Sequence, residues 1–239
     1  MASTIFLTAE WRNLVMANYA INPTILKDYV PSNTELDFWE GKCYVSLVGF
    51  MFRQVRIRGI KIPFHVNFPE VNLRFYVRYK KDNEWRRGVV FISEIVPKPT
   101  IVFIANQLFR EKYKALPMKH ILEDDKQGNL KVEYAWRNKK RWNSIGVKAE
   151  AKTVSMVKGS KEEFILEHYW GYTLINSART GEYQVQHPRW NIHQVSEYNV
   201  DCDFGALYGP AFSHLEKEAP TSVFLGEGSP IKVFTKTVL

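Results

Sequence analysis

The chain has 239 residues, of which 45% are hydrophobic and 24% are charged, the composition of an ordinary globular protein. A chain of this length buries enough apolar surface to hold a core without a disulfide or a structural metal ion. We expect one domain over residues 1–239. The aromatic share of 14% favours sheet surfaces and the walls of pockets.

Cysteine and histidine usage indicates neither a disulfide framework nor a metal site. Cys43 and Cys202 form no Cys-x-x-Cys pair, and the six histidines do not pair at metal-ligand spacing. Residues 1–8 lack the basic lead and apolar run of a signal peptide, and no stretch approaches about 18 continuous apolar residues. We therefore expect a cytoplasmic protein with no metal, no cofactor and no membrane span.

The formal charge of +8 is concentrated in two segments. Residues 53–87 hold ten Arg and Lys against three acidic residues, and residues 126–148 hold seven against one. Such clustering is the electrostatic footprint of a protein associated with nucleic acid. It is also what alternating strands give when their charges lie on a solvated face, and no zinc-finger, helix-turn-helix or RNP-type motif accompanies it. We favour the solvated face.

The first part of the chain favours a strand, a short helix and a second strand. Residues 11–19 show no helical stripe and predict a strand. Asn22-Pro23 then supplies a cap and a first-turn proline for a helix through Tyr29. Residues 43–52 are apolar on both faces, which is typical of a fully buried central strand.

The segment 71–79 alternates cleanly between two faces. A turn over residues 81–84 leads to a returning strand over 88–96, so the two segments predict a hairpin. One face of the first strand is apolar and consists of Val71, Leu73, Phe75, Val77 and Tyr79. The other face is polar and consists of Asn72, Arg74, Tyr76 and Arg78.

Two helices and several short strands are predicted in the remainder. One helix starts over 101–108 and is closed by Pro117, and a capping box at Ser160 and Glu163 starts another that runs to Tyr169 or Tyr172. The predicted strands cover 130–136, 145–154, 183–187, 192–198, 223–225 and 231–237. Many short strands without a βαβ rhythm favour an antiparallel sandwich or barrel, mainly β with few helices.

Arg74 and Glu94 are the first candidates for a site. They lie on facing strands of the predicted hairpin, Arg74 between Asn72 and Tyr76 on the polar face and Glu94 inside an otherwise apolar run. If these faces meet inside a barrel, the two side chains pair or hold a carboxylate of a ligand. On an outer face they are an ordinary cross-strand ion pair.

Two further groups have reactive side chains. His187 is held before a proline and close to Trp190, where an imidazole can act as acid, base or hydrogen-bond donor, although a lone histidine is more often structural. Lys112, Lys114 and Lys119 lie near aromatic residues and proline. A buried lysine amine can attack a carbonyl to form a Schiff base, whereas the same lysines on an exposed helix are solvated.

Several segments together resemble the YqjF-like proteins, an uncharacterised family grouped with the acetoacetate decarboxylase superfamily. The most telling are Asn-Leu-Arg-Phe-Tyr-Val over 72–77 and His-Pro-Arg-Trp over 187–190, and the resemblance spans roughly residues 8 to 210. It implies a mainly β fold with a minor helical part. A bent antiparallel sheet closes into a barrel-like cone around an apolar pocket, with a few short peripheral helices.

Decarboxylases of that superfamily form a Schiff base on a lysine from a tyrosine–proline–lysine–lysine segment. In this chain the corresponding region is Tyr-Lys-Ala-Leu-Pro-Met-Lys over 113–119. If the prolines are aligned, the position of the nucleophile holds Met118 and only the helper position holds a lysine, Lys119. If the tyrosines are aligned, the nucleophile's position holds Ala115. The resemblance therefore implies the pocket without the reactive lysine.

We expect a protein that binds a small carboxylate or keto compound in this pocket. Arg74 would hold the carboxylate, and Glu94, Tyr113 and His187 would orient the ligand or its keto group. Tyr76 and Trp190 would complete the binding residues. The alternative is a Schiff-base lyase or decarboxylase that uses a lysine near 114–119, with Lys119 and Glu94 as catalytic residues. A second alternative is a basic protein associated with nucleic acid.

Overall fold

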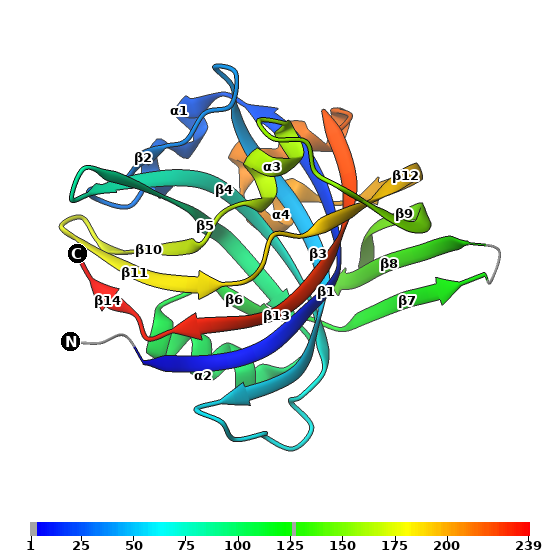
Figure 1. Cartoon of the computed structure of the whole chain (residues 1–239), viewed down its shortest axis with the longest axis horizontal. Coiled ribbons are helices and arrows are strands. Elements are labelled where there is room, and N and C mark those ends of the chain that lie inside the picture. Colours follow the sequence, from blue (N-terminus) through cyan, green and yellow to red (C-terminus); the bar gives the residue numbers. More distant parts are fainter. Residues whose placement is uncertain (1–3, 126–127) are drawn as a thin grey trace.

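Long strands dominate the chain, as the alternating and uniformly apolar segments predict (Figure 1). The computed structural model describes residues 4–125 and 128–239. The predicted central strand is β3 (Cys43–Ile57), whose first ten residues are all buried. The predicted first strand is β1 (Ile5–Ile21), which pairs antiparallel with β3.

The predicted hairpin is confirmed, with longer strands than expected. β4 (Phe68–Lys81) and β5 (Glu84–Val96) pair antiparallel from Lys81–Glu84 at the turn to Val71–Ile95. The turn residues Asp82 and Asn83 have φ values of 48° and 64°. Asp and Asn tolerate this left-handed conformation better than most residues, and two such residues in succession give the twist that a two-residue hairpin needs.

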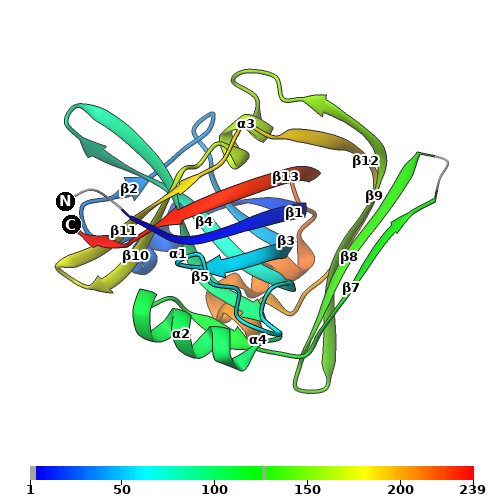
Figure 2. The ribbon, with the colours of Figure 1, turned by 60° about the horizontal axis from the view of Figure 1, so that its bottom comes forward.

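Seven strands close into a ring. The order β11–β10–β5–β4–β3–β1–β13 returns to its start because β11 also pairs with β13, at Val185–Val233 and Gln186–Lys232. Within the ring only the β10–β5 pair is parallel. The bent sheet thereby forms the barrel-like cone (Figure 2). The three strands not yet given are β10 (Trp170–Asn176), β11 (Arg179–Gln186) and β13 (Ser222–Phe234).

One glycine allows a close approach of β13 to β1. Gly228 has a φ of 77°, and a Cβ added to it would lie 2.0 Å from the backbone oxygen of Trp11. No side chain fits in that space, and the positive φ also favours glycine. The close approach lets β13, which joins the two predicted segments 223–225 and 231–237, follow β1 along its length.

The sheet continues beyond the ring on the far side of β13. Its four strands extend away from the cone as long hairpins (Figure 2); they are β12 (Asn191–Asp201), β9 (Arg141–Ser155), β8 (Asn129–Asn138) and β7 (Met118–Asp124). Short strands complete the set: β2 (Glu35–Leu36), β6 (Tyr113–Ala115) and β14 (Thr237–Val238).

Two hydrophobic cores lie on the two faces of the ring. The outer core joins the predicted apolar face of β4, including Leu73 and Phe75, to Tyr134 and Trp136 of β8 and to residues of α4 (Phe204–Tyr208). The inner core joins the opposite faces of the same strands, with Phe50 among its members. The face of β4 that the sequence marks as polar therefore points into the cone.

The helices are shorter than predicted. The first is confirmed as α1 (Pro23–Leu26) and a 3₁₀ turn, η1 (Lys27–Tyr29), with the Asn22 side chain capping Thr24 N. The second, α2 (Pro99–Phe109), does not reach Pro117, because Arg110 takes a left-handed φ of 53°. The last helical segment is η2 (Pro210–Lys217).

The Ser160 cap is confirmed, but the Glu163 carboxylate accepts from Gly159 N instead of closing the box on Ser160 N, and the helix stops early. α3 (Lys161–Leu166) begins where the Ser160 side chain accepts from Glu163 N, and it does not reach Tyr169 or Tyr172. Trp170 instead pairs with Gly88 at the start of β10, so pairing with a distant strand overrides the local helical signal.

Some predicted features lie outside the described residues. These are residues 1–3, part of the segment read for a signal peptide, and Lys126 and Gln127, part of the basic segment. Over the two described ranges, no helix combines the length and the apolarity that crossing a membrane requires.

Candidate functional site

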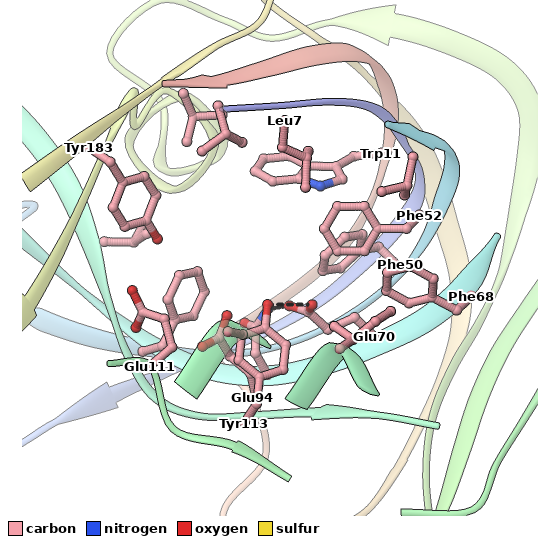
Figure 3. A pocket seen from close by; sticks show the side chains of 18 of the residues that line it. Leu7, Trp11, Phe50, Phe52, Phe68, Glu70, Glu94, Glu111, Tyr113 and Tyr183 are labelled. Carbon is pink, nitrogen blue, oxygen red and sulfur yellow. Dashed lines mark hydrogen bonds between the residues drawn. The ribbon is translucent and has the colours of Figure 1, made fainter. Parts of the chain in front are cut away.

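A cavity of about 180 Å³ lies inside the ring (Figure 3). Its wall comes from strands β1, β3, β4, β5, β11 and β13, and α2 contributes Ile101 and Ile104. One side is apolar and formed by Leu7, Trp11, Phe50 and Phe52 (Figure 3). Carboxyl and hydroxyl groups gather on the opposite side. A space of this size and lining suits a small organic molecule with one polar end.

The period of two along β4 aims its polar residues into the cavity. Glu70, Asn72 and Arg74 share one face of the strand, and all three line the cavity. Asn72 pairs in register with Glu94 of β5, so the Glu94 side chain emerges on the same face. The hairpin thus delivers three ionisable side chains and one amide to one place.

A bulge in β5 keeps Phe91 on the same face as Glu94. Leu73 pairs with Ser93, but Arg74 pairs with Phe91, so Ile92 is an extra residue in the ladder. Without the bulge, Phe91 and Glu94, three positions apart, would point to opposite faces. With it, both line the cavity. Bulges are common next to functional sites because they re-aim side chains in this way.

One hydroxyl group lies near both Glu70 and Glu94 (Figure 3). Tyr113 OH donates to Glu70 Oε2 at 2.9 Å, and its proximity lowers the pKa of Glu94 against the larger effect of burial. Asn72 Nδ2 donates to the other oxygen of Glu70 at 3.0 Å. Burial raises the pKa of Glu70 to about 7, against the lowering effect of these two donors and of Arg74. Burial, together with the nearby Glu111 and Glu70, raises the pKa of Glu94 well above its usual range.

The backbone around Tyr113 is fixed by one asparagine. β6 runs parallel to β5 and places Tyr113 beside Glu94. Asn106 of α2 donates to Tyr113 O at 3.1 Å and accepts from Tyr113 N at 2.9 Å, so its amide mimics a strand partner. These two hydrogen bonds to the main chain fix the position of Tyr113, and with it the hydroxyl near Glu70 and Glu94.

Glu111 is the third buried carboxyl group at this end. Its Oε1 accepts from Thr173 Oγ1 at 2.5 Å and from Lys236 Nζ at 3.3 Å, and Lys236 also donates to Thr173 at 2.7 Å. Burial raises the pKa of Glu111 and lowers that of Lys236, and the ion pair opposes both shifts. The two charges are largely neutralised by each other.

Tyr183 closes the side of the cavity between the carboxyl groups and the apolar wall, and its hydroxyl points inward (Figure 3). It crosses β10 at Gly171: a Cβ at that position would lie 2.1 Å from Tyr183 Cζ. Only glycine leaves room for the ring there. Burial raises the pKa of Tyr183 well above its usual range, so the phenol is neutral at physiological pH.

Three buried polar atoms at this end lack a hydrogen-bond partner among the residues that the structure describes. They are Arg74 Nε, Asn72 Oδ1 and Glu94 Oε2. Asn72 and Glu94 are only 1% and 3% exposed, so bulk water does not replace the missing partners. Leaving such a group unsatisfied costs about 1–3 kcal/mol, so unmet donors and acceptors around one cavity indicate a missing partner there.

His187 lies between two aromatic rings at the wall of the cavity. It stacks on Tyr169 at 4.6 Å and on Trp190 at 4.3 Å between ring centroids, and its Nδ1 lies 2.8 Å from Pro188 O. Burial lowers the pKa of His187, so the ring is neutral. Trp190 donates from Nε1 to Ser229 Oγ at 2.8 Å, and its ring meets Trp11. Both predicted residues line the cavity.

His168 is a second neutral imidazole in the wall, and sequence reasoning passed over it. Burial lowers its pKa to about 4, although Asp37 lies near and opposes the shift. Asp37 itself pairs with Arg87 at 2.6 Å. Burial would raise the pKa of Asp37, but the nearby His168 and the hydrogen bond from Arg87 bring it below its usual value.

The remaining predicted residues lie away from the cavity wall. Tyr76 is fully buried behind it, with its hydroxyl 2.6 Å from Ser46 Oγ and its ring on His168. Lys119 is exposed on β7, with Nζ 4.7 Å from the centroid of the Trp142 ring. Lys114 donates to Leu207 O at 2.6 Å. The lysines near 114–119 are therefore not brought to the carboxyl groups.

The basic segment 53–87 is divided between two environments. Arg74 faces the cavity, whereas Arg78, Arg86 and Arg87 pair with Glu35, Glu182 and Asp37. Arg78 and Arg86 also lie over the rings of Trp85 and Trp170. Much of the positive charge on the hairpin is thus engaged within the molecule.

Comparison with known proteins places these features in a family. Residues 8–230 match the DUF2071 family of uncharacterized conserved proteins. The chain is 32% identical over 130 residues to the uncharacterized protein YqjF of Bacillus subtilis, a match that covers 54% of this chain and spans half the length of that protein.

Solved structures show the same fold at low identity. The chain is similar to the enduracididine biosynthesis enzyme MppR, solved with pyruvate (TM-score 0.66, 12% identity, 100% of this chain and 91% of that one). It is also similar to the acetoacetate decarboxylase of Legionella pneumophila (TM-score 0.65, 12% identity, 98% of this chain and 87% of that one). A third similar structure is an acetoacetate decarboxylase-like enzyme of Sphingomonas wittichii RW1 (TM-score 0.66, 10% identity, 99% of this chain and 94% of that one). The chain belongs to the DUF2071 family and has the fold of the acetoacetate decarboxylases.

Proposed function

We propose that this protein binds a small, largely apolar molecule that carries a carboxylate, a keto group or both, inside the cone. The observation that carries the proposal is the cavity that runs from an aromatic wall to polar atoms without partners. Arg74 Nε donates to the ligand's carboxylate. Tyr183 and Glu94 face the same end, and Trp11 and Phe50 contact the apolar part.

The charges at the polar end are compatible with such a ligand. Glu111 is neutralised by Lys236, and burial together with the neighbouring acids raises the pKa of Glu94, which favours its protonated form. The charges that then remain at the polar end are those of Arg74 and of a partly ionised Glu70. A carboxylate bound beside Arg74 meets one cation and a protonated acid, and its charge further favours the protonated form of Glu70.

Other features fit the proposal. MppR, which has the same fold, has been solved in complex with pyruvate, a small keto acid. The ligand class here rests on Arg74 and the cavity, since 12% identity supports the fold alone. We propose the cytoplasm as the compartment, because both cysteines are buried and free. The lyase alternative lacks a lysine from 114–119 at the polar end, where Lys114 instead donates to Leu207 O and Lys119 is exposed on β7.

Three probes that share one phenyl-alkyl body separate the parts of this proposal. They are 4-phenyl-2-oxobutanoate with both polar groups, 4-phenylbutanoate with the carboxylate alone, and 4-phenyl-2-butanone with the keto group alone. We expect thermal stabilisation and calorimetric binding to follow that order. Arg74→Ala should weaken binding of the two acids about 10- to 100-fold, the effect of losing one charge-assisted hydrogen bond.

Arg78→Ala is the matched control, because Arg78 lies on the same strand but pairs outside the cavity with Glu35. It should leave the affinities unchanged. Equal binding of all three probes by wild type and Arg74→Ala would remove Arg74 from the site. No binding of any probe would overturn the proposed function.

A further inference from the structure

The cavity meets the molecular surface where two segments lie side by side (Figure 1, Figure 2). One is the link between β3 and β4, and the other is α2. Ile62 and His65 of the link and Thr100 of α2 line the cavity, although each is exposed or partly exposed. We call residues 55–67 and 97–110 the mouth of the cavity.

Three large apolar side chains of the mouth lie in solvent. Ile60 is 69% exposed, Phe64 is 87% exposed and Phe103 is 68% exposed. One exposed apolar residue is ordinary on a protein surface. Several of them around the opening of an apolar cavity are typical of a surface that contacts another body.

The backbone of the link holds Phe64 away from the protein. His65 N donates to Ile62 O at 3.1 Å and closes a turn, in which Phe64 has a φ of 64°. This left-handed conformation favours glycine and is unusual for a bulky side chain. Val55 N donates to Val66 O at 3.0 Å, so the link is anchored at its base. Neither local backbone preference nor contact with water favours this placement of a phenyl ring, and a partner outside the chain would.

The charge of the mouth has one sign. Its two segments contain no Asp or Glu and five Arg and Lys, which are Arg56, Arg58, Lys61, Lys98 and Arg110. Arg56 and Arg58 are exposed, and they join none of the ion pairs among the residues that the structure describes. The mouth therefore suits a partner that is negatively charged at its surface and apolar beneath it.

We propose that the mouth docks on the surface of a bilayer that contains anionic lipids. Ile60, Phe64 and Phe103 enter the boundary between headgroups and acyl chains, and Arg56, Arg58 and Lys61 meet the lipid phosphates. Docking joins the opening of the cavity to an apolar layer, so an apolar ligand can enter without crossing water. The proposal concerns the outer surface and does not depend on which molecule the cavity binds.

Two other partners match only one property of the mouth. A nucleic acid offers phosphates but no apolar layer for an aliphatic side chain such as Ile60. A second copy of the chain offers apolar groups, but two mouths facing each other bring the same positive charges together. Both partners are outcomes of the test.

Vesicle flotation with the full chain tests the docking. The vesicles contain phosphatidylcholine alone or equal parts of phosphatidylcholine and phosphatidylglycerol. We expect the chain to float with the mixed vesicles at low salt and much less with phosphatidylcholine alone. Binding to the mixed vesicles should weaken as salt is added, because salt screens the charges.

Substitutions in the mouth assign the binding to its residues. Phe64→Ser and Phe103→Ser should each lower the partition coefficient about 10-fold, the effect of withdrawing part of a phenyl ring from an apolar layer. Arg58→Glu should lower it on mixed vesicles about 30-fold, since each charge near such a surface contributes about 5-fold. All three side chains are exposed, so thermal unfolding should show that the variants keep their fold.

Val157→Ser and Lys158→Glu are the matched controls. Val157 is 74% exposed and Lys158 is also exposed, in the link between β9 and α3. This link lies on the other side of the molecule from α2 (Figure 1, Figure 2). Both controls should partition as wild type does. Equal losses in the controls and in the mouth variants would overturn the assignment to the mouth.

A fluorescent label reports which side chain enters the bilayer. Both native cysteines are buried, so an environment-sensitive, thiol-reactive dye should label Phe64→Cys or Val157→Cys at the introduced thiol. On mixed vesicles we expect a blue shift of the emission at position 64 and no shift at position 157. The same emission change at both positions, or none at either, would contradict docking through the mouth.

The remaining outcomes decide between partners. Wild type that stays off the mixed vesicles at low salt would overturn the proposal. In that case, binding of duplex DNA that is lost in Arg58→Glu would assign the mouth to nucleic acid. A dimer in sedimentation that is lost in Phe64→Ser would assign it to a second copy of the chain.

Discussion

The two faces of β4 are equally buried but are built differently. Leu73 and Phe75 on the outer face are fully buried and pack against other apolar groups. Glu70 and Asn72 on the inner face are 2% and 1% exposed, yet they carry charge, a raised pKa and an unpartnered atom. The outer face contributes stability. The inner face costs stability, and such a cost is typical of a site that awaits a ligand.

The largest expected loss of stability comes from a substitution on the outer face. Phe75→Ala should lower the free energy of unfolding by about 3–5 kcal/mol, because the ring is fully buried and its removal leaves a cavity. Urea denaturation measures the loss. Since no atom of Phe75 lines the inner cavity, the variant should bind 4-phenyl-2-oxobutanoate normally when folded. A loss below about 1 kcal/mol would contradict the role given to this face.

The inner face should reveal its cost through pH. The Glu70 pKa of about 7 lies above the value of about 4.3 expected in the unfolded chain. The folded protein therefore holds more protons between these values, so Glu70 makes stability fall as pH rises through this window. Glu70→Gln lacks this titration. Its free energy of unfolding, relative to that of wild type, should therefore rise by about 1–3 kcal/mol between pH 4 and pH 8.

The difference in stability between wild type and Glu70→Gln isolates the contribution of Glu70. His168, with a pKa lowered to about 4, makes stability fall as the pH drops below about 6.5, but it is present in both proteins and cancels. Denaturation curves at a series of pH values give the difference. A difference that is constant across the window would show that the Glu70 pKa is not raised.

Gly171 tests how closely the inner wall is packed. Gly171→Ala places a methyl group 2.1 Å from Tyr183 Cζ, so the ring must leave its position. We expect a loss of about 1–3 kcal/mol in stability, typical of overpacking, and weaker ligand binding. Gly226→Ala is the matched control, because its Cβ would have no neighbour closer than 3.6 Å. Equal effects of the two substitutions would contradict the close contact between Gly171 and Tyr183.

The smallest expected effect on stability is at the proposed ligand contact. Glu94→Met replaces an acid that has an unpartnered oxygen by an apolar side chain of similar length. Because the buried acid lacks a full set of partners, stability should stay within about 1 kcal/mol of wild type or rise. A drop of several kcal/mol in thermal or urea unfolding would mean that Glu94 is a structural group.

The sequence predicted the hairpin that forms the site, but only part of the site itself. Alternation over 71–79 placed Arg74 on a polar face, and a period of two is a local property that a single sequence shows. Whether that face points in or out depends on closure of the ring by β11 and β13, which are more than 40 positions apart. Local patterns do not contain that pairing.

The residues that sequence reasoning missed came together through long-range contacts. Glu70 precedes the clean alternation and follows Pro69, while Glu111 lies in the short link between α2 and β6. Lys236 reaches Glu111 across 125 positions. The alternation signal could have been extended backwards to Glu70. The other two had no local signal, because their partners are set by the fold.

A crystal structure of the chain with 4-phenyl-2-oxobutanoate tests the central claim most directly. We predict the phenyl ring against Trp11 and Phe50, the carboxylate within about 3.2 Å of Arg74, and the keto end of the molecule at Glu94 Oε2. A ligand bound outside the cone, or one with its carboxylate turned towards Trp11, would contradict the account.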